Sequence, residues 1–334
     1  MDPVTHGLIG ASAAQSAADP MKLRLAAIAG AAAAMLPDLD VLIGTPDDPL
    51  LTLEYHRQFT HSVFLAPAGA LLVTAALWWI VKKQLNLKET YLFSLLGMTT
   101  AGIADIFTSY GVQYFWPVSN TRFSWNLVSV FDPLFTLGIL IPFGLALYTR
   151  KRTWGWMALG WVGIYLLFAL TQQQKAEIAA REMAANRNHF METLIVKPTL
   201  GNQLVWSTRY VSGNRIYADG VRLLPFAEPL VYRGESAPLV RWRNRFEQYR
   251  GTVLYRDIRR FSELSGGILV DHPETQQVIG DGRYAMLPTS VSPLWGIRAD
   301  TTRPNEHVAF NTYRDAGPEV RSQFINMLLG RPIN

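Results

Sequence analysis

Two shortages mark this sequence: it has no cysteine, and the first half of the chain carries few charges. Without cysteine the protein can form neither disulfide bonds nor thiolate metal sites, and it has no thiol nucleophile. It also lacks the G-x-S-x-G elbow, the Walker loop and the Rossmann fingerprint, which argues against the enzyme classes that depend on them. Residues 1–10 lack the positively charged segment and the cleavage site of a signal peptide.

Charged residues are distributed unevenly along the chain. Residues 1–170 contain 10 Lys and Arg and 10 Asp and Glu, whereas residues 171–334 contain 21 and 16. The formal net charge of +5 therefore lies entirely in the second half, while the first half is rich in Ala, Leu, Ile, Phe and Trp. This contrast predicts a membrane part followed by a soluble part.

Four segments of the first half have the length and composition of membrane spans. They are residues 62–81 and 154–170, which carry no charge, residues 91–110, which carry only Asp105, and residues 127–148, which carry only Asp132. Two Ala-rich stretches, residues 6–18 and 25–36, are shorter, so we expect them to be helices buried or partly inserted in the same bundle. The first half is therefore predicted to be an α-helical membrane bundle of four long spans and two shorter helices.

Basic residues in the loops orient this bundle, because positively charged loops stay on the cytoplasmic side of a membrane. The residues concerned are Lys22 and Arg24, then Lys82, Lys83 and Lys88, and finally Arg150, Lys151 and Arg152. These three loops are expected in the cytoplasm, which places residues 111–126 and everything after residue 170 outside. In the inner membrane of a bacterium, the C-terminal domain would then be periplasmic.

The pattern changes twice in the second half. Residues 171–192 are polar and helix-prone, which predicts a helical stalk that leaves the membrane. Residues 193–334 contain short alternating runs separated by Gly, Asn and Pro, and the runs on either side of Gly213 are predicted to form a hairpin. The fold class is thus an α-helical membrane bundle at residues 1–170, followed by the stalk and by a small β-rich soluble domain.

The basic balance of the second half could indicate binding of nucleic acid or of anionic lipid. However, its arginines are interleaved with acidic residues, and Arg241, Arg243 and Arg245 alternate as they would on one face of a strand. This pattern favours a solvated or lipid-facing surface, so no nucleic acid partner is expected.

Ionisable residues at membrane depth are costly, so each of them needs a reason. In the first half they gather in short motifs, namely Thr5-His6-Gly7, Pro37-Asp38-Leu39-Asp40, His56-Arg57, Thr60-His61-Ser62, Asp105 and Phe131-Asp132-Pro133. The predicted topology places all of these motifs at the outer membrane face. Imidazole nitrogen together with carboxylate oxygen suits zinc, manganese or iron. Asp38 and Asp40 could bind two ions, and two-metal sites commonly serve phosphoester hydrolysis.

Several of these residues also have a purely structural interpretation. Asp132 precedes a proline and could serve only to cap a helix. Asp38 and Asp40 could form an ordinary turn, and His6 could cap or pack at the start of the chain. These alternatives remain open on the sequence alone.

The spacing of His56 and His61 is five residues, which would not place both side chains on one face of a straight helix. We therefore expect His56 in a loop and His61 on the first turn of the span that follows. Asp105 is the hardest residue to explain structurally, because it lies near the outer end of an otherwise apolar span.

The order of these motifs resembles a known family. The segments that carry the resemblance are MDPVTHGLIGA, AAMLPDLDVLIG, EYHRQFTHSV, DIFTSYGVQYFWPVS and VSVFDPLFT, which together run from residue 1 to about residue 136. They resemble the YdjM-type family of inner-membrane proteins, which are regarded as metal-dependent hydrolases. More distantly, they are similar to the zinc-dependent phospholipase C and single-strand nuclease group. The resemblance implies metal-ligand roles for His6, Asp38, Asp40, His56, His61 and Asp105.

One position departs from the family pattern, which usually reads His-x-x-x-Asp and ends at Asp105. Here the position four residues before Asp105 is Ala101. Two ligands four residues apart share one helix face, so this chain lacks half of that site. Either another side chain replaces the histidine, or the site holds fewer metals, or catalysis has been lost.

The leading interpretation is a membrane-bound hydrolase that uses a divalent metal, preferably zinc, with Asp38 and His61 as catalytic residues. The reaction that the resemblance implies is attack of metal-activated water on a phosphoester, such as that of a membrane phospholipid or a small molecule. The alternative is a catalytically silent membrane protein with a structural metal site and an outer domain that binds a partner. A transporter is less favoured, because the polar residues gather at one membrane face and not near the midplane.

Overall fold

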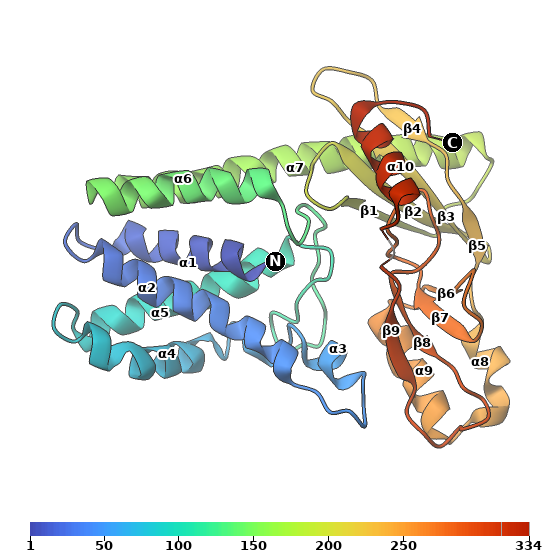
Figure 1. Cartoon of the computed structure of the whole chain (residues 1–334), viewed down its shortest axis with the longest axis horizontal. Coiled ribbons are helices and arrows are strands. Elements are labelled where there is room, and N and C mark those ends of the chain that lie inside the picture. Colours follow the sequence, from blue (N-terminus) through green and yellow to red (C-terminus); the bar gives the residue numbers. More distant parts are fainter. Residues whose placement is uncertain (315, 334) are drawn as a thin grey trace. The chain divides into compact units, whose positions relative to one another are not determined.

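The computed structural model describes residues 1–314 and 316–333, and these residues form two compact units. The first unit comprises residues 1–43, 55–171 and 200–202 and is helical (Figure 1). The second comprises residues 44–54, 172–199 and 203–334 and contains the β-sheets. The chain is therefore a helical N-terminal region with a β-sheet domain after it, as the sequence predicts.

The helices of the first unit are built from apolar segments, and α1, α5 and α6 start at a polar capping residue. They are α1 (Pro3–Ala17), α2 (Leu23–Met35), the 3-10 helices η1 (Leu36–Leu42) and η2 (Phe59–His61), α4 (Ala66–Val81), α5 (Leu87–Ile106), α6 (Pro133–Thr149) and the first half of α7 (Thr153–Asn186). Asn86 and Glu89 form a reciprocal capping box at the start of α5. Asp132 caps α6 by accepting a hydrogen bond from the Phe135 amide. It is not only a cap, because its Oδ2 also accepts a hydrogen bond from the Tyr165 hydroxyl at 2.6 Å.

Two helical segments are long and apolar enough to cross a membrane, namely residues 23–42 and 153–186. A third would be added if Leu51–His61 and Ala66–Val81, which meet at 84°, formed one span. The prediction of four long spans is therefore not reproduced. One reason is that α6 begins only at the residue after its Asp132 cap, which leaves it 17 residues long. The Ala-rich stretch at residues 25–36 is instead extended by η1 and reaches the length of a span.

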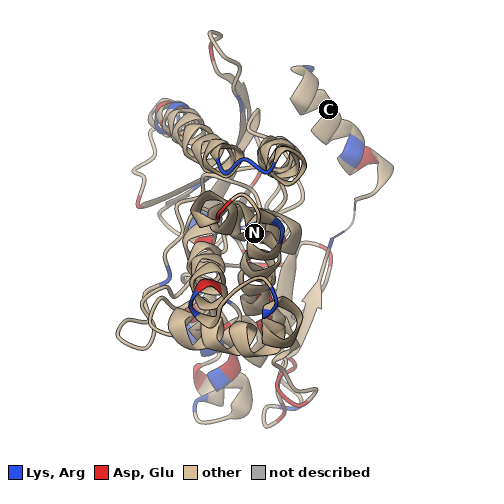
Figure 2. Cartoon of the chain, turned by 90° about the vertical axis from the view of Figure 1, so that its left-hand side faces the viewer, with Lys and Arg blue, Asp and Glu red and all other residues tan. Residues whose placement is uncertain are grey.

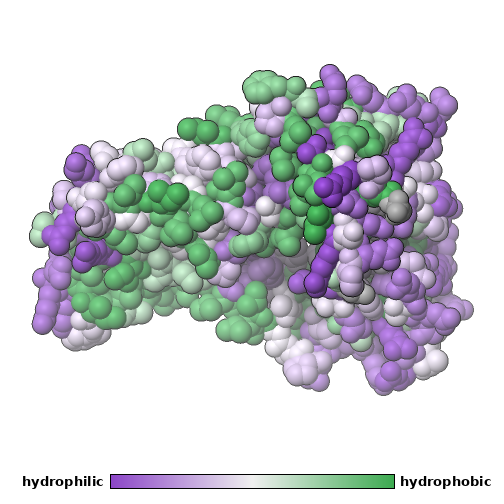
Figure 3. Space-filling view, turned by 45° about the horizontal axis from the view of Figure 1, so that its top comes forward, coloured by the Kyte–Doolittle hydropathy of each residue, from purple (hydrophilic) through white to green (hydrophobic). Residues whose placement is uncertain are grey.

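Broad hydrophobic areas cover the face of the helical unit that Figure 3 shows. Large apolar side chains that are exposed include Leu71, Leu72, Trp79 and Ile80 on α4, Leu137, Leu140 and Ile141 on α6, and Trp156, Ile164 and Leu167 on α7. Exposed apolar surface on this scale fits contact with lipid tails and not with water.

The loops that join α1 to α2, α4 to α5 and α6 to α7 lie together at one end of the helical unit (Figure 1). Figure 2 looks at this end and shows basic residues in the loops and few charges along the helices. The three basic loops of the sequence thus share one end of the unit, and the polar motifs of η1 and η2 lie toward the other end.

Small residues allow the helices at the centre of this unit to approach closely. A Cβ atom placed on Gly30 would lie 2.3 Å from the carbonyl oxygen of Gly10, and one placed on Gly97 would lie 2.2 Å from the carbonyl oxygen of Gly30. Only glycine fits at these positions, so α1, α2 and α5 pack backbone against backbone, which is common among membrane helices.

The second unit has two antiparallel sheets with short helices. The elements are α3 (Leu51–Tyr55), which runs into the first unit, the second half of α7, β1 (Thr193–Pro198), β2 (Val205–Ser212), β3 (Arg215–Arg222), β4 (Leu230–Tyr232), β5 (Ser236–Pro238), α8 (Trp242–Arg245), the 3-10 helix η3 (Glu247–Tyr249), α9 (Val253–Leu264), β6 (Leu269–Asp271), β7 (Val278–Asp281), β8 (Trp295–Arg298), β9 (Ala309–Thr312) and α10 (Pro318–Leu329). One sheet has the order β1-β2-β3-β4, with β5 also paired to β3, and the other has the order β6-β7-β8-β9. Ser212 pairs with Arg215 across Gly213, so the predicted hairpin is confirmed.

The segment that follows the apolar part of α7 packs on the first sheet. Ala176, Ala179, Ala180 and Met183 recur at helical spacing and form a core with Trp206 of β2. The residues predicted to be a stalk thus continue the same helix and lie against a sheet. Their small side chains bring the helix close to the strands.

One prediction in the second unit was wrong. Arg241, Arg243 and Arg245 do not lie on a strand, because β5 ends at Pro238 and the helical turn α8 spans Trp242–Arg245. Trp242 is buried in a core with the apolar face of α9, and this anchoring holds the segment in a helical turn.

The second unit also includes residues 44–54, which leave the helical region between η1 and η2. Leu50 is fully buried in the core that α9 covers. Arg260 of α9 binds Glu54 and Asp48 of this segment at 2.7 and 2.9 Å. Hydrogen bonding to Glu54 and Asp48 raises the pKa of Arg260 above its already high ordinary value. Between the motif at Asp40 and the motif at His56, the chain is therefore part of the second unit.

Candidate metal centre

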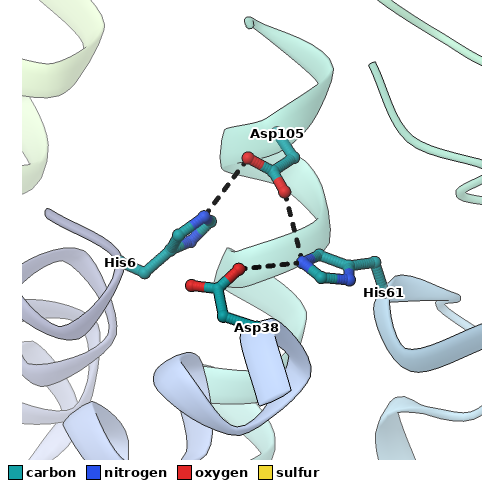
Figure 4. A group of neighbouring side chains, drawn as sticks. All are labelled: His6, Asp38, His61 and Asp105. Atoms are coloured by element: carbon teal, nitrogen blue, oxygen red, sulfur yellow. Dashed lines mark hydrogen bonds and ion pairs between the residues drawn. The ribbon is translucent and has the colours of Figure 1, made fainter. Parts of the chain in front are cut away.

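Four ionisable side chains from four different elements of the helical unit converge on one point (Figure 4). They are His6 of α1, Asp38 of η1, His61 of η2 and Asp105 of α5. One ligand atom of each residue lies within 4.8 Å of the corresponding atoms of the other three. Together these side chains could hold a metal ion.

Local sequence explains how two of these side chains reach the group. Asp2 caps α1 by accepting a hydrogen bond from the Thr5 amide at 3.0 Å, and Pro3 starts the helix, which leaves His6 in its second turn. Pro37 stands at the start of η1 and has no amide hydrogen, so Asp38 follows in a tight 3-10 turn.

The segment that carries His56 and His61 is held mainly by backbone hydrogen bonds. The amide of Gln113 donates to the carbonyl of Arg57 at 2.9 Å, and the amide of Val63 donates to the carbonyl of Tyr114 at 3.0 Å. His61 ends η2, five residues before α4 begins, so the expectation that it lies on the first turn of a span was wrong.

Asp105 is fully buried and is the anionic centre of the group. Its Oδ1 lies 3.2 Å from Nε2 of His6 and also contacts the amino group of Met1. Its Oδ2 lies 3.2 Å from Nε2 of His61 and 2.9 Å from Nε of Arg57. An unpaired carboxylate at such a position would be very costly, so these partners account for its presence in an apolar helix.

His61 is the hub of the group because both of its ring nitrogens face carboxylates. Nε2 lies 3.2 Å from Asp105 and 3.6 Å from Asp38, whereas Nδ1 lies 3.4 Å from Asp40 and 3.0 Å from the hydroxyl of Thr60. A carboxylate on one nitrogen of a histidine fixes the ring and leaves the other nitrogen free to bind a metal. This arrangement directs Nε2 of His61 into the group.

Asp40 and His56, two further candidates from the sequence, lie beside the group and not within it. Asp40 accepts hydrogen bonds from the Arg57 amide at 2.8 Å and the Thr60 hydroxyl at 2.6 Å, and it lies 2.6 Å from Nδ1 of His56. Both carboxylate oxygens of Asp40 are therefore engaged. Its position suits a residue that orients His61, with His56 supporting it from behind.

Each of the four converging side chains has a buried polar atom without a hydrogen-bond partner among the described residues. These atoms are Nδ1 of His6, Oδ2 of Asp38, Nε2 of His61 and Oδ2 of Asp105. The last two make ion-pair contacts, because they lie 3.2 Å apart and Oδ2 of Asp105 also lies 2.9 Å from Nε of Arg57. Buried polar atoms are nearly always satisfied, so such a cluster indicates a missing partner. A divalent cation bound by nitrogen and oxygen would satisfy several of these atoms at once.

Arg57 stands in the His56-Arg57 motif, but the sequence pattern gave it no role at the site. Its side chain is almost fully buried, pairs with Asp105 and donates a hydrogen bond to Thr108 at 2.9 Å. Its backbone has a φ of +59°, which is unusual for a residue with a large side chain. The signal in the sequence was the scarcity of charge, because an arginine between two histidine motifs in an apolar region needs a partner.

Ala101, the departure from the family pattern, is fully buried one turn before Asp105 on α5. The group of four forms without a side chain from this position, because α1 and η2 supply both imidazoles. The loss of the usual histidine thus leaves enough potential ligands for one metal ion.

Comparisons with known proteins agree with the resemblance of the motifs. The model of the YdjM inner membrane protein family matches residues 1–176, which include all four converging side chains. A curated relative from Bacillus subtilis (strain 168), "Uncharacterized protein YfhP", is 25% identical over 218 residues, which are 60% of this chain. The chain matches 62% of the length of that relative. No solved structure matches this chain.

Proposed function

Because the chain belongs to the YdjM inner membrane protein family, we propose that this membrane protein is a metal-dependent hydrolase of a phosphoester. The observation that carries the proposal is the convergence of two imidazoles and two carboxylates with unsatisfied buried atoms. We favour a phospholipid as the substrate, because the site belongs to the helical unit, whose exposed apolar side chains fit contact with lipid tails. A small soluble phosphoester is the other candidate.

His6, Asp38, His61 and Asp105 would hold the metal ion, with zinc preferred over manganese or iron because of the two imidazoles. When bound, such an ion polarises a phosphoryl oxygen and activates water as a nucleophile. Asp40 would orient His61 through Nδ1. Arg57 would pair with Asp105 and hold its carboxylate in position.

Asp38 is the member of the group best placed to handle a proton. Its side chain is 13% exposed, whereas those of His61 and Asp105 are fully buried. Its Oδ1 lies 3.6 Å from Nε2 of His61, and its Oδ2 has no partner among the described residues. We assign to Asp38 the role of accepting a proton from the attacking water. We assign to His61 the role of keeping Asp38 and the metal in fixed positions relative to each other.

Replacement of Asp38 by asparagine is expected to lower hydrolysis at least 100-fold, because the amide keeps the shape but loses the proton acceptor and one anionic ligand; general base catalysis alone contributes about 10²–10⁴-fold. The measurement is release of the phosphomonoester product by detergent-purified protein with added zinc or manganese, from phospholipid micelles and from a soluble aryl phosphodiester. Asp19→Asn is the matched control, because Asp19 is exposed in the loop between α1 and α2. Equal activity of the Asp38 variant and the wild type would refute the assignment.

A catalytically silent protein is the second candidate, and one observation favours it. Asp105 already has two cationic partners, Arg57 and the Met1 amino group, and such a cluster can stabilise a bundle without any reaction. In that case the metal would be structural or absent, and the second unit would bind a partner. A stable, metal-loaded wild type with no activity on either substrate class would support this alternative.

We also propose the membrane orientation that the basic loops predict, with the C-terminal domain in the periplasm. The three basic loops share one end of the helical unit, which is what a common cytoplasmic location requires (Figure 1). Reporter fusions after Lys88 and after Arg152 are expected to report the cytoplasm, and a fusion near the C-terminus the periplasm. A periplasmic signal from the Lys88 fusion would reverse the orientation.

A further inference from the structure

The surface of the second unit has an open cavity of about 590 Å³ beside the helical turn α8 and helix α9. Four arginines and two aromatic residues matter most among its lining residues, namely Arg243, Arg250, Arg256, Arg259, Trp242 and Tyr255. The cavity lies outside residues 1–176, the segment that the family model matches. It is therefore separate in sequence from the proposed metal centre.

The charge of the cavity wall is not balanced. Arg250 pairs with Glu247 at 3.3 Å, and Arg259 pairs with Glu263 at 2.9 Å. Arg243 and Arg256 have no carboxylate partner in the part of the chain that the structure describes. Four guanidinium groups against two carboxylates leave a surplus of about two positive charges, and the repulsion between them would be relieved by an anion.

Packing beneath the cavity directs these arginines to its surface, where all four are exposed. The apolar face of α9 is buried through Leu254, Ile258 and Phe261, which turns Arg256 and Arg259 outward. Trp242 and Tyr255 meet edge to face with ring centroids 5.4 Å apart, and the guanidinium of Arg243 lies 4.9 Å from the Trp242 ring. An arginine that rests on an aromatic ring loses less freedom when it binds a ligand.

The N-terminus of α9 adds to the positive electrostatic potential of the cavity, but few of its backbone N–H groups are free to donate a hydrogen bond. Thr252 caps the helix by accepting a hydrogen bond from the Tyr255 amide, and the Leu254 amide donates to the Pro304 carbonyl. The hydrogen bonds to a ligand must therefore come from the arginine side chains, which present several donors in a planar fork.

From this combination we infer that the arginine cavity, the space lined by these four arginines, binds a phosphomonoester group. A phosphomonoester carries a charge of about −1.5 to −2 at neutral pH and three acceptor oxygens, which matches the surplus charge and the free guanidinium donors. A carboxylate would neutralise only half of the surplus. The phosphomonoester can belong to a soluble molecule or to a lipid headgroup of the phosphatidic acid type.

The experiment uses the full-length protein in phosphatidylcholine nanodiscs with chelator present, so that phosphate does not bind at the metal centre. Calorimetric titration with inorganic phosphate and with glycerol 3-phosphate is expected to show saturable binding. The double variant Arg243→Gln, Arg256→Gln is expected to weaken it about 100-fold, or about 10-fold for each charge-assisted contact removed. The matched double variant Arg215→Gln, Arg321→Gln removes two exposed charges away from the cavity wall and should bind as the wild type does.

A second titration separates the two sources of the phosphate group. Water-soluble, short-chain phosphatidic acid should bind at least 10-fold more tightly than glycerol 3-phosphate if the ligand is a lipid, and equally tightly if it is a soluble molecule. Both results support phosphomonoester binding. Absence of saturable binding, equal weakening by both double variants, or tighter binding of a single-stranded oligonucleotide than of either phosphomonoester would overturn the inference. None of these outcomes depends on hydrolase activity, because the variants leave the metal centre unchanged.

Discussion

Replacing His61 with alanine is expected to lower the affinity for metal by at least 100-fold, so that the purified protein retains almost none; even loss of a residue that only supports a ligand costs about 10–100-fold. His61 faces Asp38 and Asp105 through Nε2 and Asp40 through Nδ1. Its removal therefore takes away the imidazole that Asp40 orients and that would bind the metal. Elemental mass spectrometry of detergent-purified wild type and variant, both supplemented with zinc, measures the effect directly.

Two further histidine variants make this experiment specific. His56→Ala should cause a smaller loss, about 10-fold, because His56 acts through Asp40 and not on the metal. His189→Ala is the matched control, because His189 lies in the second unit, where its Nδ1 is 2.9 Å from the Tyr210 hydroxyl. Equal metal content in the His61 and His189 variants would place the site elsewhere. A wild type without metal after supplementation would favour the silent membrane protein.

The second large effect is expected at Asp105, where substitution by leucine should destabilise the helical unit by about 3–5 kcal/mol. The leucine would leave Arg57 buried without its carboxylate partner. The cost comes from the stranded charge and not from a cavity, since leucine branches at the same atom as aspartate and is not smaller. The measurement is thermal unfolding in detergent at a fixed metal concentration, with tryptophan fluorescence as the readout.

A compensating variant tests whether the stranded charge is the cause. Arg57→Met combined with Asp105→Leu removes both partners, so the double variant should recover much of the stability that Asp105→Leu alone loses. Recovery would show a coupling between the two residues that a simple packing defect does not produce. A double variant that is as unstable as the sum of the two single variants would contradict the proposed ion pair.

Features that depend on near neighbours in the sequence could be predicted from it. The cap at Asp132, the hairpin around Gly213 and the concentration of ionisable residues in a few motifs were all evident, because each follows from residues within a few positions of one another. The separation into a hydrophobic helical region and a β-sheet domain was also evident from the distribution of charge. The lengths of the helices were not, since a single capping residue can shorten an apolar run by six positions.

The grouping of the candidate ligands depended on packing between distant segments. His6, Asp38, His61 and Asp105 come from four elements, and their spacing along the chain carries no information about the distance between their side chains. The glycine contacts that bring α1, α2 and α5 together and the backbone hydrogen bonds of residues 57–63 decide which side chains converge. The same packing placed Asp40 behind His61 and brought Arg57 to Asp105, because a buried charge is stable only where the folded chain supplies its partner.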